Sequence, residues 1–227
     1  MSKRTDIIDG PTSVYKDYGL IYTCLCGWIN LGQARPTNVR SLWSKLVGDS
    51  GVRSRKHPGF KVQHTQTINR HRSHKNVSKT FYVQSHLSSV ERESVALAIF
   101  MEVSYGFQTV QTDFPYGWTT DSGFTAEVLI SNIIGFYRAV RPGRDYISMC
   151  QPVKKEAALE VWDTQGGAGK KKNRFFGTYI YPSIACGSSS GPMCAPLPNF
   201  LNGITPAQKG TLYRDWDPNE DGRLPGG

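Results

Sequence analysis

One stretch of the sequence, residues 90–106, limits the possible folds more than any other. Ser88 and Glu91 have the spacing of a helix capping box, and a helix is predicted to follow through VERESVALAIFMEVSYG. Its middle, VALAIFM, is apolar on every side, and a helix of that kind is buried on every side. We therefore expect a central helix that other elements of the fold cover.

The rest of the chain offers both helices and strands as covering elements. Helices are predicted over residues 37–47 and from about Thr125 to Val140, and a buried strand over residues 20–29. The segments GFKVQHTQTI and KTFYVQSHL read as a long hairpin, and ALEVWDT and RFFGTYIYP as short strands. We expect an α+β fold with a small antiparallel sheet packed on two buried helices. We expect a single hydrolase-like domain over residues 1–227, with an irregular lead-in over 1–18 and a flexible tail over 216–227.

The positive charge of the chain is concentrated in one segment. The sequence has 27 Lys and Arg against 18 Asp and Glu, a net charge of +9. No acidic residue lies between Asp49 and Glu91, and all five histidines lie there. The basic residues of this segment are Arg53, Arg55, Lys56, Lys61, Arg70, Arg72, Lys75 and Lys79. Such a segment is either a solvated basic loop or the surface that meets an anionic partner: a nucleic acid, a membrane surface or a cell-wall polymer.

The sequence predicts no membrane span and no conventional export signal. No run of about 18 uninterrupted apolar residues occurs. The first residues, MSKRTDIIDG, lack the apolar core of a signal peptide.

A cysteine and a histidine form the first candidate for a catalytic site. Cys24 or Cys26 comes shortly before the helix predicted over residues 37–47, and His64 lies on a predicted strand about 40 residues later. A helix N-terminus and an imidazole both favour a reactive thiolate, and this order along the chain is that of papain-like hydrolases. Both cysteines also fit as small apolar residues of a buried strand, and the sequence does not separate the two.

Glu102 is the second candidate, because helical spacing puts it on the same face as Val95 and Ile99. A carboxylate in an apolar setting suits a general acid, and a loop carboxylate such as Asp121 would complete a glycan-cleaving pair. Trp118 in the same loop suits stacking on a sugar ring. The alternative for Glu102 is pairing with a buried arginine or a backbone donor.

Two weaker patterns concern the basic hairpin and the cysteine count. His64, His71 and His74 with Asn76 resemble the residues of metal-dependent nuclease sites, although no acidic metal ligand accompanies them. The alternative is a solvated hairpin tip. Five cysteines cannot form a complete set of disulfides, and a bridge between Cys186 and Cys194 would close the loop CGSSSGPMC in an oxidising compartment. No spacing of cysteines and histidines indicates zinc, and we predict neither a metal nor a cofactor.

Three blocks of the sequence resemble a family of uncharacterised bacterial envelope proteins regarded as lipoproteins of unknown function. The blocks are GLIYTCLCGWINLGQARP, AIFMEVSYGF and DSGFTAEVLISNIIG. The positions that match the family are Tyr22, Thr23, Gly27, Glu102, Ser122, Phe124, Ser131 and Asn132. Asn30 stands where the family has Asp, and Gln33 and Met101 stand where it has His. The resemblance therefore adds Ser122 to the candidate substrate-binding residues, beside Asp121 and Trp118.

At the level of class, the chain is similar to antibacterial effectors that type VI secretion delivers, several of which are papain-like cell-wall peptidases. That similarity implies a hydrolase that cleaves peptidoglycan as an amidase or endopeptidase. It also implies secretion without a signal peptide, action in the target-cell periplasm, a secretion-machine carrier and an immunity protein. The implied partner polymer is peptidoglycan or another anionic polymer. The alternatives are a glycan-cleaving enzyme built on Glu102 and a basic nucleic-acid-directed toxin or binding module.

Overall fold

The computed structural model describes residues 2–70, 73–112, 125–168, 173, 176–188 and 191–222. The chain packs as two compact units, each built from two separate segments. Unit 1 comprises Met1–Pro36 and Gln108–Gly203, and unit 2 comprises Thr37–Phe107 and Ile204–Gly227. Both helices and strands are present, so the predicted α+β class is confirmed. The single domain and the papain-like arrangement stay predictions.

The sheet of unit 1 has four short strands in the order β1-β2-β5-β6. These are β1 (Leu20–Thr23), β2 (Gly27–Asn30), β5 (Thr178–Ile180) and β6 (Met193–Ala195), and the pair β2–β5 is parallel whereas its neighbours are antiparallel. The prediction of one strand over residues 20–29 is therefore wrong, because β1 and β2 form a tight hairpin. Gly27 permits the turn with a positive φ of 69°, where a side chain is strained.

The α-helices of unit 1 lie between β2 and β5 in the chain. They are α3 (Val128–Val140), α4 (Tyr146–Met149) and α5 (Lys155–Gln165), with short 3-10 helices η1 (Arg4–Asp6), η3 (Ile184–Cys186) and η4 (Asn199–Leu201). The predicted strand ALEVWDT is part of α5, so that prediction is wrong. Ala158 and Val161 are its buried residues, three positions apart, which is the spacing of one helix face.

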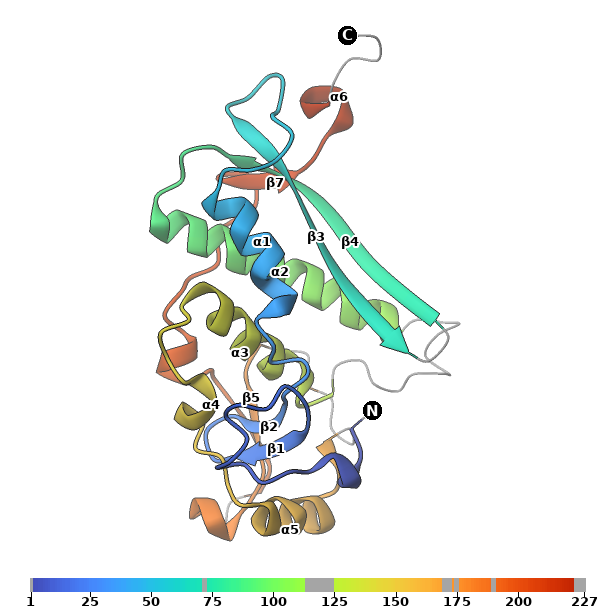
Figure 1. The fold of residues 1–227 in the computed structure, drawn as a ribbon, viewed down its shortest axis with the longest axis vertical. Coiled ribbons are helices and arrows are strands. Elements are labelled where there is room, and N and C mark those ends of the chain that lie inside the picture. Colours follow the sequence, from blue (N-terminus) through green and yellow to red (C-terminus); the bar gives the residue numbers. More distant parts are fainter. Residues whose placement is uncertain are drawn as a thin grey trace. The chain divides into compact units, whose positions relative to one another are not determined.

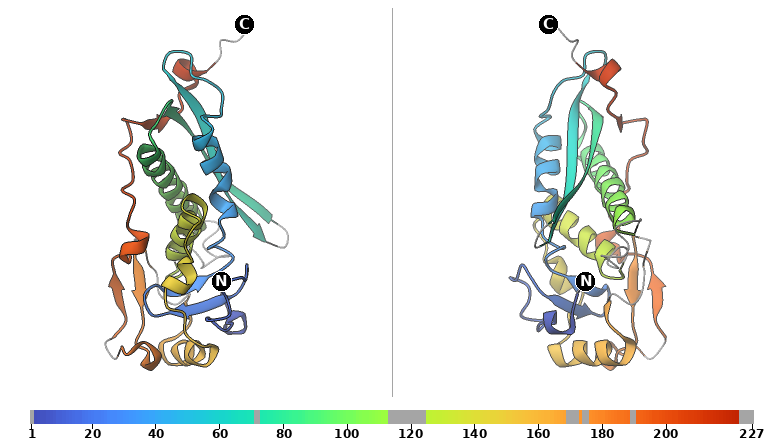
Figure 2. Two further views of the ribbon diagram at one scale, coloured as in Figure 1. Left: turned by 60° about the vertical axis from the view of Figure 1, so that its left-hand side comes forward. Right: turned by 90° about the vertical axis from the view of Figure 1, so that its right-hand side faces the viewer.

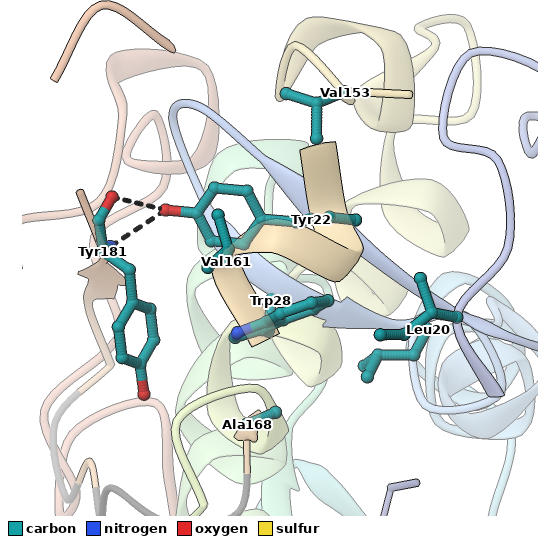
Figure 3. Packing of buried hydrophobic residues seen from close by; sticks show 9 residues of the cluster. Leu20, Tyr22, Trp28, Val153, Val161, Ala168 and Tyr181 are labelled. Atoms are coloured by element: carbon teal, nitrogen blue, oxygen red, sulfur yellow. Dashed lines mark hydrogen bonds between the residues drawn. The ribbon is translucent and has the colours of Figure 1, made fainter. Parts of the chain in front are cut away.

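Aromatic rings dominate the core of unit 1. Tyr22 and Trp28 lie side by side across the β1–β2 hairpin, with ring centroids 5.1 Å apart. The Tyr22 hydroxyl donates to the backbone oxygen of Tyr181 at 2.8 Å and accepts from its backbone N–H at 2.9 Å. Figure 3 shows this double contact among the buried residues of the cluster. One hydroxyl thus ties the N-terminal hairpin to a chain segment 159 residues away.

Unit 2 is built on a long antiparallel hairpin with a third short strand, in the order β3-β4-β7. The strands are β3 (Gly59–Arg70), β4 (Ser73–Gln84) and β7 (Tyr213–Asp215), and the helices are α1 (Thr37–Val47), α2 (Ser89–Thr112) and α6 (Pro218–Asp221). The predicted hairpin and the predicted helix over 37–47 are both present. The capping box of α2 is also confirmed, since Ser88 and Glu91 exchange side-chain and backbone hydrogen bonds.

The two faces of this sheet have different surroundings. Phe60, Val62, Phe81 and Val83 point inward and are fully buried. In Figure 1 and in the left-hand view of Figure 2, α1 and α2 lie on the same side of the hairpin. The apolar segment of α2 from Val95 to Phe100 is buried, as predicted. The other side of the hairpin faces away from both helices.

The end of the chain is ordered further than the sequence predicts. Asp221 of α6 is fully buried and accepts hydrogen bonds from Arg214, from the Ser54 hydroxyl and from the backbone of Asp217. The tail predicted to be flexible from Trp216 therefore packs on unit 2 up to Gly222. Among the helices of the described residues, none is long and apolar enough to cross a membrane.

Candidate functional site

Cys24, one of the two predicted nucleophiles, is bonded to Cys186 in a disulfide. A sulfur in a disulfide has no thiolate to attack a carbonyl, so the structure contradicts this role for Cys24. The bond also bears on the bridge considered between Cys186 and Cys194, which the structure does not contain. Cys186 pairs with Cys24 rather than with Cys194, which is exposed and free.

Cys26, the other predicted nucleophile, is buried, with 1% of its surface exposed. Its Sγ lies 2.6 Å from the Sγ of Cys150, which is fully buried. Burial, together with the contact to Cys26, raises the pKa of the Cys150 thiol. This sulfur contacts a second thiol, which does not activate it as an imidazole would, so this environment does not favour Cys26 as a nucleophile.

His64, the predicted base, lies on the inward side of β3 against Phe100, with ring centroids 6.0 Å apart. Burial and the nearby Lys45 ammonium lower its pKa to about 4. All five cysteines belong to unit 1, whereas His64 belongs to unit 2, so neither unit by itself holds the predicted thiol–imidazole pair.

Glu102 is an ion-pair partner. Its Oε1 accepts from the ammonium groups of Lys79 and Lys209, each at 2.9 Å, and Lys209 also contacts Asp215 at 2.7 Å. The expected apolar surroundings are therefore absent around this carboxylate, which joins α2 to β4 and to the segment before β7. This pairing does not favour the predicted general acid.

The predicted substrate-binding residues Trp118, Asp121 and Ser122 lie outside the described residues. So does His71, whereas the backbone of His74 pairs with Asn69 near the end of the hairpin. The described residues do not test the roles predicted for these side chains.

A buried carboxylate that the sequence reasoning missed lies at the start of α3. Glu127 is 2% exposed, and its Oε1 accepts from the Ser2 hydroxyl at 3.2 Å. Its Oε2 is buried without a hydrogen-bond partner among the described residues. The Ser131 hydroxyl joins this group to β2, because it accepts from the backbone N–H of Asn30 at 2.9 Å and donates to the backbone oxygen of Glu127. The segment of β2 and the start of α3 thus meet where Ser131 contacts Asn30.

Tyr181 is a second buried polar group of unit 1. Its hydroxyl is buried and has no partner in the described part of the chain. Burial raises its pKa, and the charges of Tyr179 and Glu127 add to that effect. A carboxylate oxygen and a phenol without partners leave free capacity to accept a proton or to bind a polar group. The one signal in the sequence is Glu127 itself, a single acidic residue in the apolar run AEVLISNIIGF.

The outward side of the unit 2 hairpin is polar over the residues whose side chains are described, up to Gln66 on β3 and from Val77 on β4. Side chains with hydroxyl or amide groups alternate along both strands, and a lysine and a tryptophan lie at one end. We call this set the outer face: Lys61, Gln63, Thr65, Ser78, Thr80 and Trp216.

The outer face is pre-ordered by its own contacts. Gln63 Nε2 and the Thr65 hydroxyl both donate to the Ser78 hydroxyl, at 2.8 and 2.9 Å. The Lys61 ammonium lies 5.5 Å from the centroid of the Trp216 ring. Gln63, Thr65 and Ser78 are exposed, so their remaining donors and acceptors face solvent. This face can bind polar groups without reorganising.

Metal binding finds no support among the described residues, because none of their His, Cys, Asp and Glu side chains form a group of three or more that could hold an ion. Comparisons with protein-family models, with curated proteins and with solved structures found no match to the chain.

Proposed function

We propose that the protein binds peptidoglycan through the outer face of unit 2. The observation that carries the proposal is the row of hydroxyl and amide side chains beside the Lys61–Trp216 pair. Glycan chains offer hydroxyl and amide groups that match such a row, and an aromatic ring packs against the apolar side of a sugar. The Lys61 ammonium supplies a partner for a carboxylate of the polymer.

The charge of this surface fits a sparsely charged polymer better than a nucleic acid. Duplex DNA carries one negative charge per about 1.7 Å. In the set that defines the outer face, Lys61 is the one charged residue. Arg214, the cross-strand neighbour of Tyr82, pairs with Asp221, and Lys79 lies on the inward side of the hairpin, where it pairs with Glu102. In peptidoglycan, widely spaced carboxylates match the single Lys61 ammonium, and the hydroxyl and amide groups between them match the polar side chains of the outer face.

Binding to purified sacculi, measured by sedimentation, tests the proposal. Fluorescent duplex DNA in the same buffers tests the nucleic-acid alternative. We expect the protein to sediment with sacculi at about 50 and at about 200 mM salt, with only modest weakening. Tighter binding to DNA, falling by about 10³ over that salt range, would instead support the nucleic-acid alternative. If the protein stays in the supernatant at low salt, the proposal is wrong.

A second candidate, hydrolysis of the same polymer, is favoured by the buried Glu127 oxygen that lacks a partner among the described residues. Glu127 and Tyr181 are 2% and 1% exposed, so under this proposal the segments that cover them open to admit the polymer. Glu127 then accepts a proton from the attacking water and Tyr181 binds the substrate. The toxin role, type VI delivery, an immunity protein and action in the target-cell periplasm belong to this second proposal. A thiol mechanism is not part of it.

Release of soluble fragments from sacculi measures hydrolysis. We expect Glu127→Gln to abolish release, and Glu160→Gln, at an exposed position of α5, to leave it unchanged. Treatment with N-ethylmaleimide should not slow release, because Cys194 is the exposed free thiol. Absence of release by the wild-type protein would refute hydrolysis and leave binding as the function.

A further inference from the structure

Two buried cysteines of unit 1 lie sulfur to sulfur. Cys26 Sγ and Cys150 Sγ are 2.6 Å apart, and the exposed fractions of these residues are 1% and 0%. The residues are 124 positions apart in the chain. Such a contact is distinct from the Cys24–Cys186 bond, although Cys24 is only two residues from Cys26.

Backbone hydrogen bonds hold the two sulfurs in this position. The N–H of Cys24 donates to the oxygen of Gln151 at 3.0 Å, and the N–H of Leu25 donates to the oxygen of Cys150 at 3.1 Å. The Cys26 N–H is itself bound by the Thr23 hydroxyl at 3.2 Å. Since both chain segments are fixed on either side of the contact, neither cysteine needs a large backbone movement to bond with the other.

We propose that Cys26 and Cys150 form a second disulfide bond, made during folding by exchange with a small-molecule disulfide such as oxidised glutathione. In the exchange two S–H bonds break and one protein S–S bond forms. The two electrons and two protons reduce the small disulfide to two thiols. The Cys24–Cys186 bond is untouched by this reaction.

Because both sulfurs are buried in the folded protein, the exchange takes place before folding is complete. The folded protein encloses both sulfurs, and burial raises the pKa of the Cys150 thiol, which keeps the thiolate scarce. The reaction therefore belongs to the folding chain, before unit 1 closes over the pair. Once formed, the bond is shielded from reductants in the same way, and a chain with two such bonds matures in an oxidising compartment.

The wild-type protein provides the test without any substitution. Protein folded in a glutathione redox buffer is denatured at neutral pH in guanidinium chloride that already contains excess N-ethylmaleimide, without reduction, and is weighed by mass spectrometry. We expect one maleimide per chain, on Cys194. Three maleimides per chain would mean that the Cys24–Cys186 bond forms alone, and the second disulfide would be refuted.

Peptide mapping assigns the partners. Trypsin leaves Cys24 and Cys26 on residues 17–40, Cys150 on residues 145–154, and Cys186 with Cys194 on residues 175–209. The proposal predicts one species in which all three peptides are joined and which reduction separates. Recovery of peptide 145–154 alone, carrying a maleimide, would overturn it.

A Cys194→Ser variant is the matched control, because it removes the exposed thiol and leaves the buried pair. It should give the same three-peptide species with no maleimide. A joined species that changes composition in this variant would show that Cys194 takes part in the pairing, which contradicts the assignment.

Discussion

Replacing His64 tests how strongly unit 2 holds a neutral imidazole in its interior. The ring is 3% exposed, packs on Phe100, and has an Nε2 without a partner among the described residues. The cations nearest it are Lys45 of α1 and Lys79, its cross-strand neighbour. Burial and Lys45 lower its pKa from 6.5 to about 4. The unfolded chain therefore binds more protons than the folded chain between these values.

The sign and size of the effect follow from this difference. Above the pKa of the unfolded state, His64 is neutral in both the folded and the unfolded chain, so it does not change the free energy of unfolding with pH. As the pH falls, protonation of the unfolded state lowers the free energy of unfolding, and the loss is complete below the folded pKa. Between about pH 7.5 and about pH 5 the loss from His64 alone is about 2 kcal/mol.

Urea unfolding at these two pH values measures the effect in wild type and in His64→Leu. Other titrating groups contribute to both proteins and cancel in the comparison. We expect the stability of the wild type to fall by about 2 kcal/mol more than that of the variant. His57→Gln, at an exposed histidine, is the control and should behave as wild type does. Equal pH dependence in wild type and His64→Leu would show that the imidazole is protonated or solvated in the folded state.

Three further substitutions test the fold by urea unfolding at neutral pH. Tyr22→Phe removes the partner of two backbone groups of Tyr181 and should cost about 2 to 3 kcal/mol; a cost near zero would mean that water reaches those groups. Gly27→Ala should cost about 3 kcal/mol or more, because φ is 69° and a Cβ would lie 2.2 Å from the Tyr179 oxygen; a tolerated alanine would refute the tight hairpin. Burial opposes ionisation of Asp221, but its hydrogen bonds outweigh that effect and lower its pKa to about 2. Asp221→Asn should lower the free energy of unfolding by about 3 kcal/mol, and the variant should lose less stability than wild type between about pH 4 and about pH 2. The same loss in both proteins over that pH range would contradict the buried ion pair.

The parts of the fold that sequence patterns predicted are those with local signals. The capping residues Ser88 and Glu91 and the all-round apolar stretch are contained in one segment, and α2 forms there. The β3–β4 hairpin follows in the same way from two adjacent strand-forming segments.

The errors have local causes as well. An apolar run without alternation does not show where a strand turns back, so the hairpin around Gly27 was missed. Val161 and Trp162 favour strands, but Ala157, Ala158 and Leu159 favour helix, and the buried positions follow the helical spacing.

The candidate sites depended on contacts between distant segments, which local patterns do not contain. The partners of Glu102 lie 23 and 107 positions away, and the partner of Cys24 lies 162 positions away. No spacing in the sequence distinguishes a paired carboxylate from a catalytic one, or a bridged cysteine from a nucleophile. The outer face has no motif of its own in the sequence, because its hydroxyl and amide residues are spread over two strands and alternate with residues of the inward side.

The affinity for purified sacculi of a Lys61→Gln, Trp216→Leu double variant tests the central claim most directly. Loss of the ammonium and of the ring should weaken binding at least tenfold, since about 1.4 kcal/mol corresponds to that factor and each contact contributes about that much. Lys16→Gln, which removes one exposed cation from unit 1, is the charge-matched control and should bind as wild type does. Equal affinity of the double variant and the wild type, with both proteins folded, would contradict binding through the outer face.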